Sequence, residues 1–178
     1  MQFWLWYYWS RIKTIFSKSP FIKIFKKEYK KSMRVYFSTT YDQIILAPFY
    51  KNKAGIYYEQ DICSIFNLNI DDEKLGNEIM AAFNKFKYKD KNLSKEKGSD
   101  WPAYKYSKAK TLKSFDEHYI SMDISGANEK NITLDIECNV KKAPFCISSY
   151  IIPFAKKDEI GKKVKEMFNY SQKIEGII

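Results

Sequence analysis

Hydrophobic residues recur along this chain with two different periods, which predict strands followed by helices. Two stretches, Glu73–Phe83 and Asp158–Phe168, carry apolar residues at i, i+4 and i+8, which is the spacing of one helix face. Two others, Gln43–Ala47 and Asn131–Asp135, are short apolar runs of the kind found in strands. The pattern therefore predicts an α+β fold in which helices cover one face of a mixed or antiparallel sheet.

The two helical stretches also resemble each other in sequence. Both follow acidic–x–apolar–Gly–x–x–apolar–x–x–x–Phe, and their glycines, Gly76 and Gly161, lie 85 positions apart. The further strand candidates are Met33–Phe37 and Ile56–Leu68 in the first half, and Tyr119–Ile124 and Phe145–Phe154 in the second. This order predicts two tandem strand–strand–strand–helix repeats with pseudo-two-fold symmetry. The alternative is a coincidence between two amphipathic helices, which are common.

A glycine inside a helix costs about 1 kcal/mol relative to alanine, so its presence in both copies needs a reason. We expect each glycine to allow a close approach of its helix to the sheet. The acidic residues Asp71–Glu73 and Asp158–Glu159 stand where each helix begins. They could be paired catalytic carboxylates, but charges that oppose the helix dipole explain both copies at once.

Composition divides the chain into an arm and a body. Residues 1–28 form a basic, aromatic N-terminal arm, and residues 29–178 are expected to form a single domain. Within this domain we place repeat one at 29–86, an exposed lysine-rich linker at 87–99, and repeat two at 100–178.

The net charge of +10 is concentrated at the N-terminus. Residues 1–35 contain nine basic side chains and one acidic side chain, a balance of +8, which leaves +2 for the rest of the chain. The basicity of the whole chain is therefore a property of the arm, and it is weak evidence that the folded body binds nucleic acid.

The aromatic run Phe3–Trp9 is too short for a membrane span of about 20 residues, and it lacks the features of a signal peptide. The sequence thus predicts a cytoplasmic protein. Two roles for the arm stay open. It docks on the domain or mediates self-association, or residues 1–25 make peripheral contact with a membrane through tryptophan, tyrosine and lysine side chains.

No motif for catalysis, nucleotide binding or metal binding is recognisable. The three cysteines show no ligand spacing, which fits reduced and buried thiols, and the single histidine, His118, has no partner motif and is expected in a strand or turn. None of the six glycines forms a phosphate-binding loop. We therefore expect a protein that is not an enzyme and that has no cofactor and no metal.

Two segments, Asp72–Ile79 and Trp101–Tyr104, carry a resemblance to a known family. From about Lys30 to Ile178 the chain is similar to the immunity proteins of bacterial contact-dependent growth inhibition systems (the CdiI group). The resemblance implies an intracellular inhibitor, or antitoxin, that binds the C-terminal domain of a cognate toxin, often a nuclease. No binding residue of the family can be transferred to a position here. Nuclease inhibitors are often acidic, whereas this chain is basic.

For such an inhibitor, exposed aromatic side chains near loops are the natural binding anchors. The candidate toxin-binding residues are Tyr57, Tyr58, Trp101, Tyr104 and Tyr106. Each of them could instead fill the core or cover a sheet edge. The alternative function is a nucleic-acid-binding accessory protein that uses the basic aromatic arm, since aromatics interleaved with lysines can stack bases and neutralise phosphates. The small net charge of the folded domain argues against this alternative, so nucleic acid is the less favoured partner.

Overall fold

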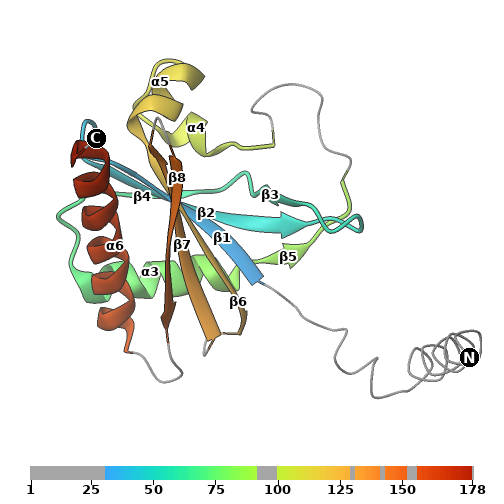
Figure 1. Cartoon of the computed structure of the whole chain (residues 1–178). Helices are drawn as coiled ribbons and strands as arrows, with labels where there is room; N and C mark the ends of the chain where they lie inside the picture. Colours follow the sequence, from blue (N-terminus) through green and yellow to red (C-terminus); the bar gives the residue numbers. More distant parts are fainter. Residues whose placement is uncertain (1–30, 92–99, 129–130, 141–142, 152–155, 178) are drawn as a thin grey trace, which may run out of the picture.

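The computed structural model describes residues 31–91, 100–128, 131–140, 143–151 and 156–177, and it confirms the predicted α+β class (Figure 1). Eight strands form one sheet with the order β3-β2-β1-β6-β7-β8, and β4 and β5 also pair with β2. All pairings are antiparallel except that of β5 with β2. The predicted arm, residues 1–28, lies outside the described residues.

The first half of the chain supplies the strands on one side of the sheet and one helix. Its elements are β1 (Lys31–Ser38), β2 (Gln43–Lys51), β3 (Tyr57–Glu59), β4 (Ser64–Phe66) and α3 (Asp72–Asn84). The extended run expected at Ile56–Leu68 is thus two short strands rather than one, and both pair with β2. The carboxylate of Asp71 caps α3, accepting the backbone N–H of Glu73 and of Lys74 at 2.9 and 3.1 Å. This supports the structural role expected for the acidic start of the helix.

The second half supplies the remaining strands and three helices. Its elements are β5 (Lys87–Tyr88), α4 (Ala103–Tyr106), α5 (Leu112–His118), β6 (Ile120–Asn128), β7 (Asn131–Val140), β8 (Ala143–Ile151) and α6 (Lys157–Ile177). His118 ends α5, where its Nδ1 donates to the Ser114 carbonyl at 2.8 Å, so its expected place in a strand or turn is wrong. Within the described ranges, no helix combines the length and the apolar character that crossing a bilayer requires.

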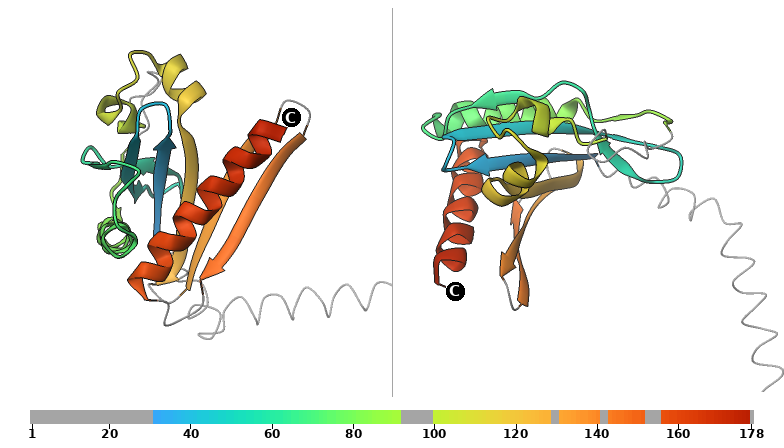
Figure 2. Two further views of the ribbon diagram at one scale, coloured as in Figure 1. Left: turned by 90° about the vertical axis from the view of Figure 1, so that its left-hand side faces the viewer. Right: turned by 90° about the horizontal axis from the view of Figure 1, so that it is seen from above.

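The two halves meet at the centre of the sheet, where β1 pairs with β6. Figure 2 shows a strongly twisted sheet in which α6 runs alongside β7 and β8. In chain order β1 is followed by β2, β3, β4 and α3, and β6 is followed by β7, β8 and α6. The division into two repeats related by pseudo-two-fold symmetry stays a prediction.

The main core lies between the sheet and the helices α3 and α6. Strand alternation turns every second residue of β1 towards these helices, and Phe37 stacks on Phe168 of α6 with ring centroids 4.5 Å apart. We call this the helix-side core. Its fully buried large side chains include Met33, Ile44, Leu46, Leu75, Ile79, Phe83, Met122, Ile124, Ile132 and Leu134.

A second apolar cluster covers part of the opposite face of the sheet. There α4 and α5 pack on β1 and β2, and Phe115 of α5 stacks on Tyr119 at 4.6 Å and contacts Tyr36 of β1 at 5.0 Å. Cys63, which belongs to the same cluster, is a buried free thiol, and burial raises its pKa to about 12. The helices α4 and α5 therefore cover only part of this side of the sheet. The rest of this side is not covered by a helix within the described residues.

The two repeated glycines lie where α3 and α6 cross. A methyl group placed on Gly76 would lie 1.7 Å from the backbone oxygen of Lys157, and one on Gly161 would lie 2.0 Å from that of Asp72. Each glycine thus faces the residue four positions before the other glycine. The expectation of a close approach is confirmed, but its partner is the other helix and not the sheet. A salt bridge of 2.6 Å between Lys165 and Asp72 joins the helices beside the crossing.

Candidate protein-binding surface

The face of the sheet opposite α3 and α6 carries charged, polar and aromatic side chains. Residues 34 and 36 of β1 alternate with the core residues and therefore point to this side, together with Phe49 of β2. Figure 1 shows α4 and α5 on one side of the central strands and α3 on the other. We call the side that carries α4 and α5 the open face.

Five aromatic rings form a continuous row on this side. Phe49 contacts Trp101 at 5.9 Å and Tyr57 at 6.3 Å; Tyr57 contacts Phe86 at 6.1 Å; and Phe86 contacts Tyr88 at 5.5 Å, all between ring centroids. We call this set the aromatic row. Its two ends are exposed, since Tyr88 is 53% and Trp101 39% accessible to solvent. Large exposed aromatics in a packed group are typical of binding surfaces.

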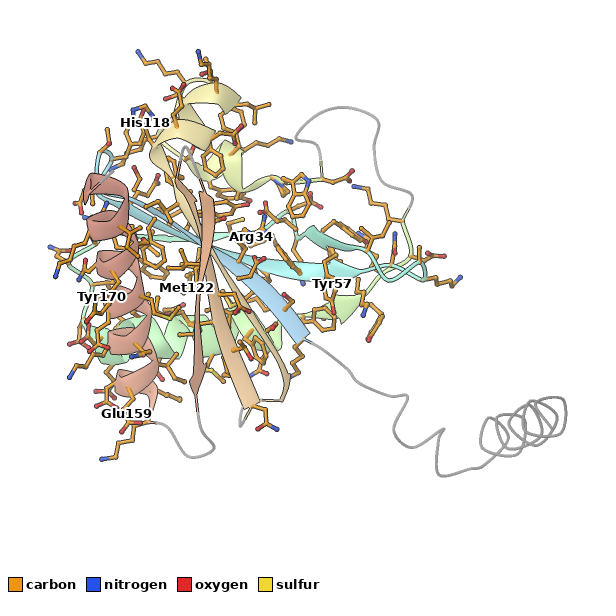
Figure 3. All side chains as sticks on the ribbon, viewed as in Figure 1. Arg34, Tyr57, His118, Met122, Glu159 and Tyr170 are labelled. Carbon is orange, nitrogen blue, oxygen red and sulfur yellow. The ribbon has the colours of Figure 1, made fainter. Side chains whose placement is uncertain are left out.

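Arg34 fixes one end of the aromatic row. Its guanidinium makes two hydrogen bonds to Asp123, of 2.6 and 2.9 Å, and lies 5.2 Å from the ring centroid of Trp101 and 5.6 Å from that of Phe49. A bidentate ion pair holds the planar group in one orientation, and the aromatic rings pack against it. Arg34, labelled in Figure 3, therefore supports the ring of Trp101 from the sheet.

Glu59 attaches the segment that carries Trp101 to the sheet. One carboxylate oxygen accepts the Tyr36 hydroxyl at 2.5 Å and the other accepts the Ala103 backbone N–H at 2.7 Å. The Glu59 backbone N–H also donates to the Asp100 carbonyl at 3.1 Å. Trp101 lies between these two attachment points. Burial raises the pKa of Glu59, and the hydrogen bonds from Tyr36 and Ala103 only partly oppose this rise.

The pKa of Glu59 leads to a pH-dependent prediction for Glu59→Gln. The amide can accept from Ala103 and donate to the Tyr36 hydroxyl, so the variant keeps the network without a buried charge. Because the pKa of Glu59 is higher in the folded than in the unfolded state, the wild type loses stability relative to the variant as pH rises from about 4.5 through the folded-state value. Urea titrations of both proteins across this range measure the difference.

Glu117→Gln provides the control, because Glu117 is exposed on α5. This variant makes the same substitution outside the buried network. A stability difference between wild type and Glu59→Gln that does not change with pH would contradict the role assigned to the buried carboxylate.

The structure places the five predicted toxin-binding residues in three different environments. Tyr57 and Trp101 belong to the aromatic row, whereas Tyr104 and Tyr106 are half-buried in α4, where their hydroxyls donate to the carbonyls of Lys110 and Asp61. The exposed position expected for Tyr58 is wrong. Alternation in β3 turns it to the opposite side from Tyr57, and the residue is only 2% exposed.

Sequence reasoning missed four members of this surface, namely Arg34, Phe49, Phe86 and Tyr88. Phe86 directly precedes the predicted linker, 87–99, and Tyr88 lies inside it, yet Lys87–Tyr88 forms the strand β5. The signal was the alternation of aromatic and lysine residues in Phe86–Lys89, which is strand-like. The remainder of that linker, 92–99, lies outside the described residues.

The fold and this surface define the class of protein: an α+β protein with an open sheet, two packed helices on one face and an aromatic row on the other. No protein-family model and no curated protein matches the sequence. Solved structures do resemble the fold, among them the following two.

The first is a protein of unknown function from Neisseria meningitidis, with a TM-score of 0.58 and 17% identity, covering 79% of this chain and 94% of that one. The second is a chain of a CdiA-CT/CdiI toxin and immunity complex from Yersinia pseudotuberculosis, with a TM-score of 0.52 and 12% identity, covering 75% of this chain and 92% of that one. At these identities the likeness is one of fold, and the fold is of the kind found in a toxin–immunity complex.

Proposed function

We propose that this protein is a cytoplasmic immunity protein that binds and neutralises the C-terminal domain of a cognate contact-dependent growth inhibition toxin. The observation that carries the proposal is the likeness of its fold to a chain of a toxin and immunity complex over 75% of its length. The resemblance of Asp72–Ile79 and Trp101–Tyr104 to the same group supports it. Such an inhibitor acts by occupying a surface of the toxin and needs no reactive side chain.

The aromatic row is the surface that suits this role best. An inhibitor of a toxin needs a Kd near nanomolar, which corresponds to about −12 kcal/mol. An interface of roughly 1,600 Å² reaches this value only when a few well-packed anchors are buried at its centre. Trp101, Tyr57 and Tyr88 are already held in place by their neighbours, so little conformational entropy is lost when a partner covers them.

The proposal is tested with the toxin domain encoded by the gene immediately upstream. The full-length protein and this domain are co-expressed and passed together over a size-exclusion column. We expect one stable complex with one copy of each protein, and loss of the toxin's activity in the complex. Separate elution of the two proteins at low salt would contradict the proposal.

A further inference from the structure

Lysine side chains gather on the helix side of the strands whose other side carries the aromatic row. Lys87 of β5 pairs with Tyr50 of β2, and the Lys89 ammonium lies 4.9 Å from the ring centroid of Tyr50. Alternation in β2 places Tyr50 on the same side as Leu46, which belongs to the helix-side core. Alternation in β5 turns Tyr88 to the opposite side, where it joins the aromatic row. Lys87 and Lys89 therefore share the helix side of the sheet.

A third lysine lies on this side at the beginning of β1. Alternation places Lys31 on the same side as Met33, which belongs to the helix-side core. The Lys31 ammonium donates to the Asn84 side chain at 2.7 Å and lies 5.6 Å from the ring centroid of Phe83, so it meets the last turn of α3. Lys87 follows Asn84 by three residues, and in Figure 1 the beginning of β1 and β5 lie at the same end of α3. We call this group the basic foot: Lys31, Lys87 and Lys89.

Carboxylates do not neutralise the basic foot. Among the described residues, no salt bridge involves any of its three lysines. Lys91 lies on the same side, 5.4 Å from the ring centroid of Tyr58, but it pairs with Asp100 at 2.8 Å and is therefore left out of the group. Lys85, exposed at the C-cap of α3, adds a further positive charge at this end of the helix. Positive charges in this concentration favour an anionic partner.

The basic foot continues along the chain into the N-terminal arm. Residues 21–30, which end next to Lys31, contain four lysines and one acidic residue, Glu28. Three of the four tryptophans of the whole chain, Trp4, Trp6 and Trp9, stand in its first nine residues. Tryptophan close to a polybasic stretch is typical of segments that bind the interface of an anionic membrane. The arm therefore joins the folded domain at a basic surface of that domain.

We propose that the basic foot binds the anionic lipid headgroups of a membrane, so that the arm and the folded domain attach to this membrane together. The ammonium groups neutralise lipid phosphates, and the aromatic and aliphatic side chains of the arm enter the interface. Because the basic foot and the aromatic row lie on opposite sides of β2 and β5, the attached protein leaves the aromatic row open to a partner. Membrane attachment of this kind does not depend on the proposed immunity function.

The geometry favours a membrane over nucleic acid. Binding of single strands uses aromatic rings with free faces. The rings beside the basic foot are not free: Tyr50 contacts Tyr58 at 5.4 Å, Lys89 and Lys91 lie over them, and Tyr58 is 2% exposed. The foot thus supplies point charges alone, which suit a surface of phosphate groups. The tryptophans of the arm add the preference of this residue for the membrane interface, which a nucleic-acid duplex does not satisfy.

The test measures sedimentation of full-length proteins with vesicles of phosphatidylcholine and phosphatidylglycerol. The test variant is Lys31→Gln, Lys87→Gln and Lys89→Gln, in which glutamine keeps a donor for Asn84 and removes the charge. The control is Lys105→Gln, Lys110→Gln and Lys113→Gln, three exposed lysines in and between α4 and α5 with the same change in net charge. Urea unfolding of both variants shows whether the fold persists. If the test variant unfolds more easily, the pair Lys87→Gln and Lys89→Gln, both exposed, replaces it.

We expect the test variant to bind these vesicles about 10- to 100-fold more weakly than wild type, since each lysine near an anionic surface strengthens binding several-fold. The control should bind within about 3-fold of wild type. Wild type should not sediment with vesicles of phosphatidylcholine alone. Replacing Trp4, Trp6 and Trp9 together by alanine should also weaken binding, because the arm and the foot act on the same membrane.

Equal binding of the test and control variants to the anionic vesicles would overturn the inference, as would a wild type that sediments with neither kind of vesicle. Tighter binding of wild type to a short labelled DNA duplex or single-stranded RNA than to vesicles, lost in the test variant and kept in the control, would assign the basic foot to nucleic acid and also overturn it. These outcomes leave the immunity function standing, because that function is tested by complex formation with the toxin domain.

Discussion

Replacing Gly76 by alanine is expected to lower the free energy of unfolding by about 3 kcal/mol. The new methyl group would lie 1.7 Å from the backbone oxygen of Lys157, so α3 and α6 must move apart. Backbone atoms cannot rotate out of the way as a side chain can, and the separation weakens the packing of both helices on the helix-side core. The gain in helix propensity of about 1 kcal/mol only partly offsets this loss.

Thermal and urea unfolding measure the effect, which for a chain of this length corresponds to a fall in Tm of about 6–12 °C. Gly161→Ala should behave in the same way, because its methyl group would meet the backbone of Asp72. The matched control is Lys74→Ala, an exposed site on α3, which should change stability by less than about 0.5 kcal/mol. Equal stabilities of Gly76→Ala and Lys74→Ala would contradict the close helix crossing.

Trp101→Ala is expected to weaken binding of the cognate toxin domain by about 30- to 1,000-fold, or about 2–4 kcal/mol. The indole is held between Phe49 and the guanidinium of Arg34 and still exposes 39% of its surface, which suits it to enter a pocket on a partner. Isothermal titration calorimetry with the purified toxin domain gives the change in Kd.

Tyr170→Ala is the control, because Tyr170 is 61% exposed on α6 and lies on the other side of the molecule from Tyr57 in Figure 3. It should leave the affinity unchanged. The unfolding curve of Trp101→Ala shows whether the fold persists, since the indole also covers Phe49. A folded Trp101→Ala protein with wild-type affinity would place the toxin on another surface.

The α+β class, the long strands and the helices α3 and α6 could be predicted from the sequence, because periods of 2 and 3.6 residues are local signals. The glycines show the limit of such signals. Repetition of Gly76 and Gly161 predicts a close approach, but a local pattern does not say which element approaches. Only the spatial pairing of β1 with β6 brings the two helices together. The short helices α4 and α5 were missed for a similar reason, since four and seven residues carry almost no period.

The candidate surface was predictable in part. Tyr57 and Trp101 lie near loops and were expected as anchors, and both belong to the aromatic row. The sequence did not show which of the neighbours Tyr57 and Tyr58 is buried. The side to which each residue points depends on strand register, here the pairing of Lys51 with Tyr57. Arg34 lacked a signal, since its partner Asp123 is 89 positions away.

The central pairing of β1 with β6 has a consequence for biosynthesis. The strand at residues 31–38 is made before all the other described elements, but one of its two neighbours ends at residue 128, and the helix-side core is completed only by Phe168. A nascent chain that stops before α6 leaves the apolar faces of β6 and β7 uncovered. The native core can therefore close only after α6 has left the ribosome, and products that stop before α6 would be substrates for chaperones and proteases.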